Sequence, residues 1–112
     1  MGGRRELRLE SVNPMAFGFG FNKQKALSAA EKFVQQGKLQ NAIAEYEKVR
    51  KHDDKDLTVA NTIGDLYARL GDSVKAIECF KMVGDAYAAQ GFTVKGIAMY
   101  KKITKQIGRA HV

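Results

Sequence analysis

The densest group of side chains that could do chemistry lies at residues 52–56. There His52 stands among Asp53, Asp54 and Asp56, whose imidazole and carboxylate groups could weakly attract a cation. The spacing of a calcium-binding loop and its closing glutamate are absent. Two widely spaced histidines and one cysteine do not make a zinc site either. We therefore interpret residues 52–56 as a solvated turn.

Residues for nucleophilic or phosphate chemistry are also poorly arranged. No serine or cysteine has a plausible general base beside it in the sequence. Gly18 and Gly20 do not follow a strand, so they do not form a phosphate-binding loop. The single cysteine, Cys79, falls beside an apolar helix stripe, which favours a packing role over a reactive thiol. We expect a non-catalytic protein without catalytic residues, cofactor or metal.

The composition fits one small cytoplasmic domain. The chain has 112 residues, of which 45% are hydrophobic and 28% charged, so it can form a packed core. It has no apolar run of the roughly 18 residues that a membrane span needs, and no secretory signal. The net charge is +7, but the lysines are spread and no strip of aromatic and basic residues occurs. We interpret the charge as a solvated helical surface, with a basic nucleic-acid-binding or regulatory module as the alternative.

One pattern of small and large residues occurs twice. The second copy follows the first by 34 positions, and the copies are Gly37, Ala42, Ile43, Tyr46, Val49 and Gly71, Ala76, Ile77, Phe80, Val83. A fixed period of this length indicates repeated supersecondary units. Such stacked units usually act through their surface, by holding another chain.

The elements that carry this pattern are helical. Apolar spacing predicts helices at about 23–36, 39–52, 57–70, 73–90 and 93–105, joined by short connections that make neighbours antiparallel. The residues that should end or cap them are Gly37, Asp56, Gly71, Asp72 or Ser73, and Thr93. We predict one unbroken helix of about 18 residues over 73–90, the alternative being a kink near Gly84.

Small and aromatic residues alternate along these helices. Close helix contacts are expected at Ala30, Ala42, Gly64, Ala76, Gly84 and Gly96. The rings that should fill the space beside them are Phe33, Tyr46, Tyr67, Phe80, Tyr87 and Tyr100. In the last helix Ile97, Tyr100 and Ile103 should form the core side. Since a helical glycine costs about 1 kcal/mol against alanine, Gly64 and Gly84 indicate contacts too close for a Cβ.

These residues resemble the tetratricopeptide repeat signature. The motif Ile63-Gly64-x-x-Tyr67, then Gly71, then Ala76-x-x-x-Phe80 carries the resemblance, which covers about 23–105. It lacks the early tryptophan of the family. The resemblance implies an all-α fold of five antiparallel helices in a short right-handed solenoid, and a fragment of a bacterial protein with such repeats.

In this family the first helix of each repeat lines a concave groove. By position this implies a peptide-binding groove of Gln24, Leu27, Glu31, Val34, Gln35, Thr58, Asn61, Thr62, Asp65, Ala68 and Arg69. Asn61, Asp65 and Arg69 share one face, where Asn61 could bind a peptide backbone and Arg69 a carboxylate. The alternative is an ordinary solvent-exposed helix face on which Asp65 and Arg69 form an ion pair. The Lys/Asn carboxylate clamp of chaperone-binding members is not matched.

The two ends of the chain fit the helical pattern poorly. Residues 1–22 should be a disordered or extended arm whose phenylalanines either cover the first helix or promote self-association. Met15 is a candidate natural start, which would make residues 1–14 an upstream extension. Residues 106–112 should form a tail. Residues 107–112 can be read as the translation of ATC GGA AGA GCA CAC GTC, a nucleotide string that resembles a sequencing adapter. We expect a protein-interaction module that binds a peptide or helix, or that self-associates through its open ends.

Overall fold

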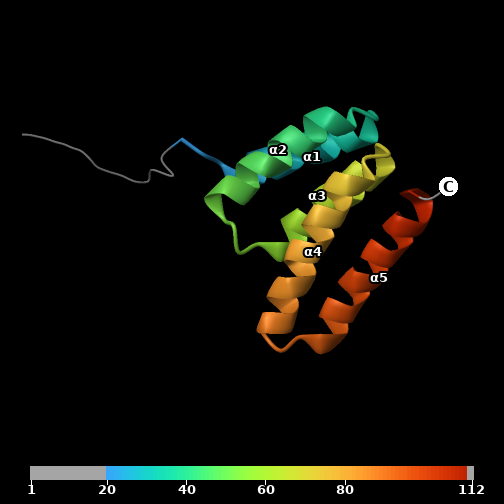
Figure 1. Ribbon diagram of the computed structural model, residues 1–112. Coiled ribbons are helices and arrows are strands. Elements are labelled where there is room, and N and C mark those ends of the chain that lie inside the picture. Colours follow the sequence, from blue (N-terminus) through green and yellow to red (C-terminus); the bar gives the residue numbers. More distant parts are fainter. Residues whose placement is uncertain (1–19, 111–112) are drawn as a thin grey trace, which may run out of the picture.

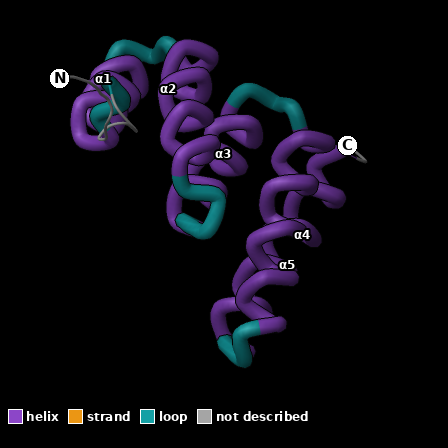
Figure 2. The backbone as a smooth tube through the Cα atoms, turned by 90° about the vertical axis from the view of Figure 1, so that its left-hand side faces the viewer, coloured by secondary structure: helices purple, strands orange, loops and turns teal. Residues whose placement is uncertain are grey.

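Five helices make up the fold. The computed structural model describes residues 20–110, and over these it contains helices and connecting loops but no strand (Figures 1 and 2). The helices are α1 (Lys23–Gln35), α2 (Leu39–His52), α3 (Leu57–Arg69), α4 (Ser73–Ala89) and α5 (Thr93–Ala110). Each packs on the next one along the chain, so the predicted all-α class is confirmed.

The connections at residues 36–38, 70–72 and 90–92 share one glycine turn. The glycines have positive φ angles of 76° at Gly37, 84° at Gly71 and 84° at Gly91, a conformation that residues with a Cβ rarely adopt. The next residue donates its N–H to a carbonyl five positions back, from Lys38 to Phe33, Asp72 to Tyr67 and Phe92 to Tyr87. This pattern satisfies the last helical carbonyls and reverses the chain. The predicted glycine ends are confirmed.

Side-chain caps begin three of the helices. Asp56 accepts hydrogen bonds from the N–H groups of Thr58 and Val59, and Asp72 accepts one from Lys75. Asn22 caps α1 in the same way. The predicted cap at Thr93 is wrong: α5 starts at Thr93, and the Gly96 N–H bonds to the carbonyl of Phe92. Phe92 holds the cap position because it follows the turn glycine, as Lys38 and Asp72 do.

Helix α4 is continuous through Gly84, which confirms the long helix over the kink. Helix α5 is longer than predicted, since it runs past Lys105 to Ala110. Residues 106–110 contain good helix formers, and Gln106 is only 5% exposed, with its side-chain oxygen 3.4 Å from the Ser73 hydroxyl. The predicted helix end at residue 105 is therefore wrong. Residues 1–19 and 111–112 lie outside the described part, so the predictions of an arm and of foreign ends stay predictions there.

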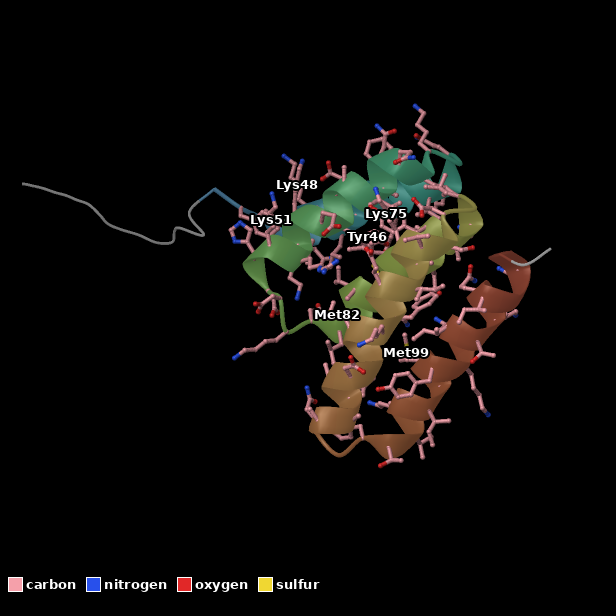
Figure 3. All side chains as sticks on the ribbon, in the orientation of Figure 1. Tyr46, Lys48, Lys51, Lys75, Met82 and Met99 are labelled. Atoms are coloured by element: carbon pink, nitrogen blue, oxygen red, sulfur yellow. The ribbon has the colours of Figure 1, made fainter. Side chains whose placement is uncertain are left out.

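The core forms two clusters. One joins α1, α2 and α3 around residues such as Tyr46 and Ile63 and also includes Cys79 of α4. The other joins α4 and α5 around Phe80 and Met99 and also includes Ala60 of α3. Figure 3 labels Tyr46 in the first cluster and Met99 in the second. Tyr67 is half-buried between them. Tyr46 and Phe80 are thus inside, as predicted.

The predicted core side of α5 is partly wrong. Ile97 is 48% exposed and Tyr100 39% exposed, whereas Met99 is 5% exposed and Ile103 is half-buried. The stripe that faces α4 is therefore rotated from the predicted one, and Gly96 makes the close approach. A Cβ at Gly96 would lie 3.4 Å from the Gly84 carbonyl oxygen.

The small residues allow close helix crossings, as predicted. A Cβ at Gly64 would lie 2.5 Å from Phe80 Cε1, and one at Gly84 would lie 2.9 Å from Tyr100 Cε1. In both pairs the ring follows the glycine by sixteen positions, so α3 meets α4 and α4 meets α5 through the same contact. One packing rule therefore recurs along the chain, and it fixes how α4 lies against α3 and α5.

Candidate functional site

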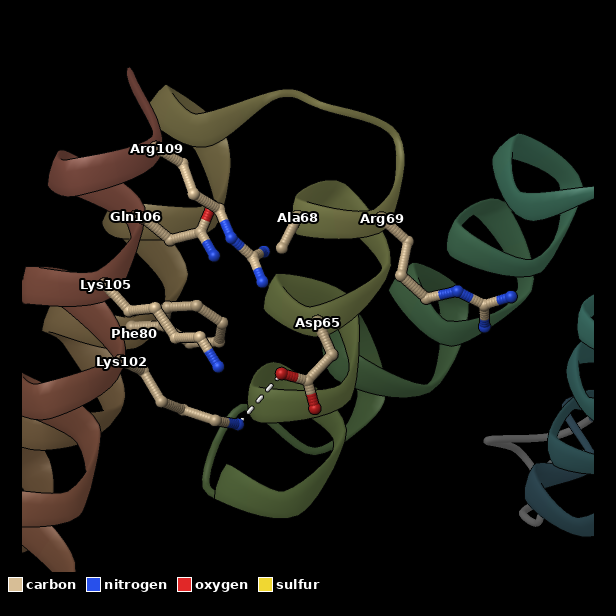
Figure 4. Close-up of a pocket in the computed structure, with 8 residues that line it drawn as sticks. All are labelled: Asp65, Ala68, Arg69, Phe80, Lys102, Lys105, Gln106 and Arg109. Carbon is tan, nitrogen blue, oxygen red and sulfur yellow. Dashed lines mark hydrogen bonds and ion pairs between the residues drawn. The ribbon is translucent and has the colours of Figure 1, made fainter. Parts of the chain in front are cut away.

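Helix α3 lies between two surface hollows. The hollow toward α1 has a volume of about 360 Å³ and is lined by Glu31, Val34, Gln35, Tyr46, Thr62, Asp65, Leu66 and Arg69. The hollow toward α5 has a volume of about 340 Å³ and is lined by Asp65, Ala68, Arg69, Phe80, Lys102, Lys105, Gln106 and Arg109 (Figure 4). Because Asp65 and Arg69 line both, the hollows meet over α3. We call their combined lining the α3 groove.

Six of the eleven predicted groove residues line the hollow between α1 and α3. They are Glu31, Val34, Gln35, Thr62, Asp65 and Arg69. Of the other five, Ala68 lines the hollow toward α5. Gln24 and Thr58 are exposed near the starts of α1 and α3, and Leu27 packs half-buried against the first core cluster. Asn61 is half-buried and is engaged by a lysine of α5. The structure thus brings the C-terminal halves of α1 and α3 together as one surface.

Lys102 organises the α5 side of the groove. Its Nζ donates to Asn61 Oδ1 and to Asp65 Oδ1, each at 2.8 Å, and lies 4.8 Å from the centre of the Phe80 ring. The predicted alternative of an Asp65–Arg69 ion pair is wrong, because Asp65 pairs with Lys102. Figure 4 shows Arg69 leaving α3 on the side away from α5, so its guanidinium is directed toward the other hollow.

Two further cations of α5 enter the site without having been predicted. Lys105 and Arg109 line the hollow between α3 and α5 and extend toward α3 in Figure 4. The sequence holds one signal for them, since residues 93–110 contain five basic residues and no acidic one. With Lys102 already bonded to Asp65, the remaining cations give this half of the groove a positive surface.

The N-terminal end of the fold is held by different contacts. Lys23 Nζ lies 3.3 Å from Asp56 Oδ2, which ties the start of α1 to the cap of α3. Phe21 stacks on His52 with ring centroids 3.9 Å apart, and packs against the first core cluster. Phe21 thus contacts the end of α2, and the predicted arm over the first helix stays a prediction, because Phe17 and Phe19 lie outside the described residues. His52 serves as a packing surface at the end of α2.

Burial, hydrogen bonds and neighbouring charges explain the shifted pKa values of three side chains, of which Tyr46 lines the groove and Cys79 and Asp85 do not. Burial raises the pKa of the Cys79 thiol, which is 7% exposed within the first core cluster. Hydrogen bonds from Lys81 and from Tyr100 lower the pKa of Asp85. Burial and, secondly, the charge of Glu31 raise the pKa of Tyr46. Over the described residues no group of three or more His, Cys, Asp or Glu side chains could hold a metal ion.

Comparisons with known proteins add no identification. No protein-family model matches the chain, and a search of curated proteins gives no match. Within residues 20–110, none of the helices has the length and apolar character to cross a membrane.

Proposed function

We propose that this chain is a protein-interaction module of the tetratricopeptide type, and that the α3 groove holds a segment of a partner protein. The observation that carries the proposal is the continuity of two hollows across Asp65 and Arg69. Together they offer a surface on both sides of one helix, the kind of surface that extended peptides and helices bind.

The chemistry of the groove favours a particular kind of segment. On the α1 side, Val34, Tyr46 and Leu66 supply apolar contacts beside the polar groups of Gln35 and Thr62. On the α5 side the free charges are cationic. A segment with an apolar anchor at one end and an acidic group at the other is complementary to both halves.

The recurrence of one contact supports the stacked arrangement. Phe80 packs on Gly64 and Tyr100 on Gly84 at the same spacing of sixteen residues. In an array of repeated units each interface should use equivalent positions. The glycine turns after α1, α3 and α4 give the same register to the connections.

A selection from a random peptide library displayed on phage tests the proposal directly. Selected peptides should combine an aromatic or aliphatic residue with Asp or Glu, and fluorescence anisotropy measures their affinity. The double variant Lys105→Ala/Arg109→Ala should bind about tenfold or more weakly. Lys51→Ala is the matched control, because Lys51 extends away from the groove on α2 (Figure 3). An equal loss of peptide affinity in the double variant and in Lys51→Ala would contradict binding in the α3 groove.

Nucleic-acid binding is the second candidate, favoured by the five basic residues of α5. If the chain binds phosphates, the logarithm of its binding constant should fall steeply and linearly with the logarithm of the salt concentration. A peptide held partly by apolar contacts should respond weakly in the same titration. Comparing a selected peptide with a single-stranded oligonucleotide over a salt series separates the two functions.

A further inference from the structure

Helix α5 carries an apolar stripe that no described residue covers. Ile97 is 48% exposed, Tyr100 39% and Ile107 45%. Together with Thr104 they are spaced by three, four and three positions, so they lie on one face of the helix. We call these four residues the outer stripe. It lies on a different face of α5 from Lys102, Lys105 and Arg109, which line the groove.

The equivalent face of α4 is occupied by a helix. Residues 73–83 of α4 match residues 93–103 of α5 closely, with Ser-Val-Lys-Ala-Ile answering Thr-Val-Lys-Gly-Ile. The positions on α4 that correspond to the outer stripe are Ile77, Phe80, Gly84 and Tyr87.

Helix α5 sits on this face of α4. Phe80 lies beneath Lys102, and Gly84 meets Met99 and Tyr100. Phe80 is 1% exposed, whereas its counterpart Tyr100 is 39% exposed. A face with this residue pattern is therefore one on which a helix packs in this fold.

One residue of the outer stripe, Tyr100, is held in place by a hydrogen bond to α4. The Tyr100 hydroxyl donates to Asp85 Oδ1 at 2.7 Å, and Lys81 bonds to Asp85 Oδ2 at 2.8 Å. These bonds fix the ring against α4 before any partner arrives, which reduces the entropy lost on binding.

The charges beside the stripe define the partner. Lys101 follows Tyr100 directly and is exposed, and α5 has no acidic residue. On the α4 side Lys81 and Asp85 neutralise each other. An approaching helix with acidic residues beside its apolar face would find complementary charges, and a basic one would be repelled.

A second copy of this chain does not have the charges that the outer stripe requires of a partner. Two α5 helices would bring like charges together. The exposed side of α1 carries Lys25, Ser28 and Lys32, and among residues 20–69 no large hydrophobic side chain is exposed. Neither described end of the molecule offers an acidic, apolar helix face to the stripe.

We propose that the outer stripe of α5 is a second docking surface, which binds an amphipathic helix of a partner protein with acidic residues flanking its apolar face. This surface is separate from the α3 groove, so either can exist without the other.

The test uses the complete chain and two labelled synthetic peptides about five turns long. Both are helical with leucines along one face, and they differ only in carrying glutamate or lysine beside the leucines. Fluorescence anisotropy should show at least about tenfold tighter binding of the glutamate peptide. Ile97→Ser/Ile107→Ser should lower its affinity about tenfold or more, whereas Leu70→Ser/Val74→Ser, at exposed positions off the stripe, should not.

Circular dichroism of each variant checks that the helices are retained. Equal affinity for the two peptides, or an unchanged affinity of the stripe variant, would overturn the proposal. Loss of binding in the groove variant Thr62→Lys would place the peptide in the α3 groove and overturn it as well. A dimer in sedimentation equilibrium that dissociates on Ile97→Ser/Ile107→Ser would instead make a second copy the occupant.

Discussion

The contact between Gly64 and Phe80 makes a sharp prediction, because Gly64→Ala should destabilise the fold although alanine is the better helix former. The new Cβ would lie 2.5 Å from Phe80 Cε1, 2.8 Å from Cδ1 and 3.0 Å from the Cβ of Cys79. Phe80 is 1% exposed and lies beneath Lys102, so its ring can move toward the neighbouring hollow only by displacing that lysine and its hydrogen bonds. Relief of the clash therefore requires either that displacement or a separation of α3 and α4.

The magnitude follows from two opposed terms. Overpacking of a filled core costs about 1–3 kcal/mol, and this contact distance places Gly64→Ala in the upper part of that range. Replacing a helical glycine by alanine stabilises the helix by about 1 kcal/mol through its higher helix propensity. The net loss should be about 1–2 kcal/mol, and Gly64→Leu should lose more. For a chain of this size each kcal/mol lowers the melting temperature by about 4 °C or more.

Urea unfolding followed by circular dichroism measures these differences against two matched substitutions. Gly84→Ala meets Tyr100 at 2.9 Å, but that ring is 39% exposed and is held at its outer end by the hydroxyl bond to Asp85 alone, so displacing it should cost less than displacing the buried Phe80 ring. Gly108→Ala in α5 meets nothing within 4 Å and should be neutral or stabilising by up to about 1 kcal/mol. If Gly64→Ala proved as stable as Gly108→Ala, the close-crossing argument would be refuted.

Four other outcomes are expected. Asp56→Ala should cost about 1 kcal/mol of unfolding free energy in urea, because two N–H groups of α3 lose their cap. Lys102→Met should cost less than about 1 kcal/mol, and the loss should shrink in high salt, since the lysine is partly exposed. Because burial raises the pKa of Cys79, its thiol ionises first in the unfolded chain; the urea midpoint should therefore fall as pH rises past the ordinary value of 9.0, and fall less in Cys79→Ala. Tyr100→Phe should raise the pKa of Asp85 toward its ordinary value in an NMR titration, because one hydrogen bond to the carboxylate is lost. An unchanged Asp85 titration would show that this bond does not form in solution.

Local features of the fold could be read from the sequence because short-range chemistry determines them. Gly37 and Gly71 mark turns that need a positive φ, and Asp56 and Asp72 cap the following helices within three residues. The close contact at Gly64 was predicted too, whereas its pairing with Phe80 is known from the structure. These signals placed four of the five helices closely.

Long-range polar contacts could not be read in this way. Lys102 meets Asn61 and Asp65 across 41 and 37 positions, and nothing in the spacing of lysines distinguishes it from Lys101. The rotation of α5 was missed because Ile97 and Tyr100 suit a core position as well as Met99 does. The close contact predicted at Gly96 is made, and Met99 rather than Ile97 faces α4 there. The residues of α5 that line the groove could therefore be identified only from the packed structure.

The central claim is that a partner segment lies along α3 between α1 and α5. Amide chemical-shift mapping by NMR, with the tightest peptide from the library selection, tests it most directly. The account predicts that the largest shifts fall at Gln35, Thr62, Asp65, Arg69 and Arg109. Shifts gathered on the outward side of α2, around Lys48 and Lys51, would contradict it.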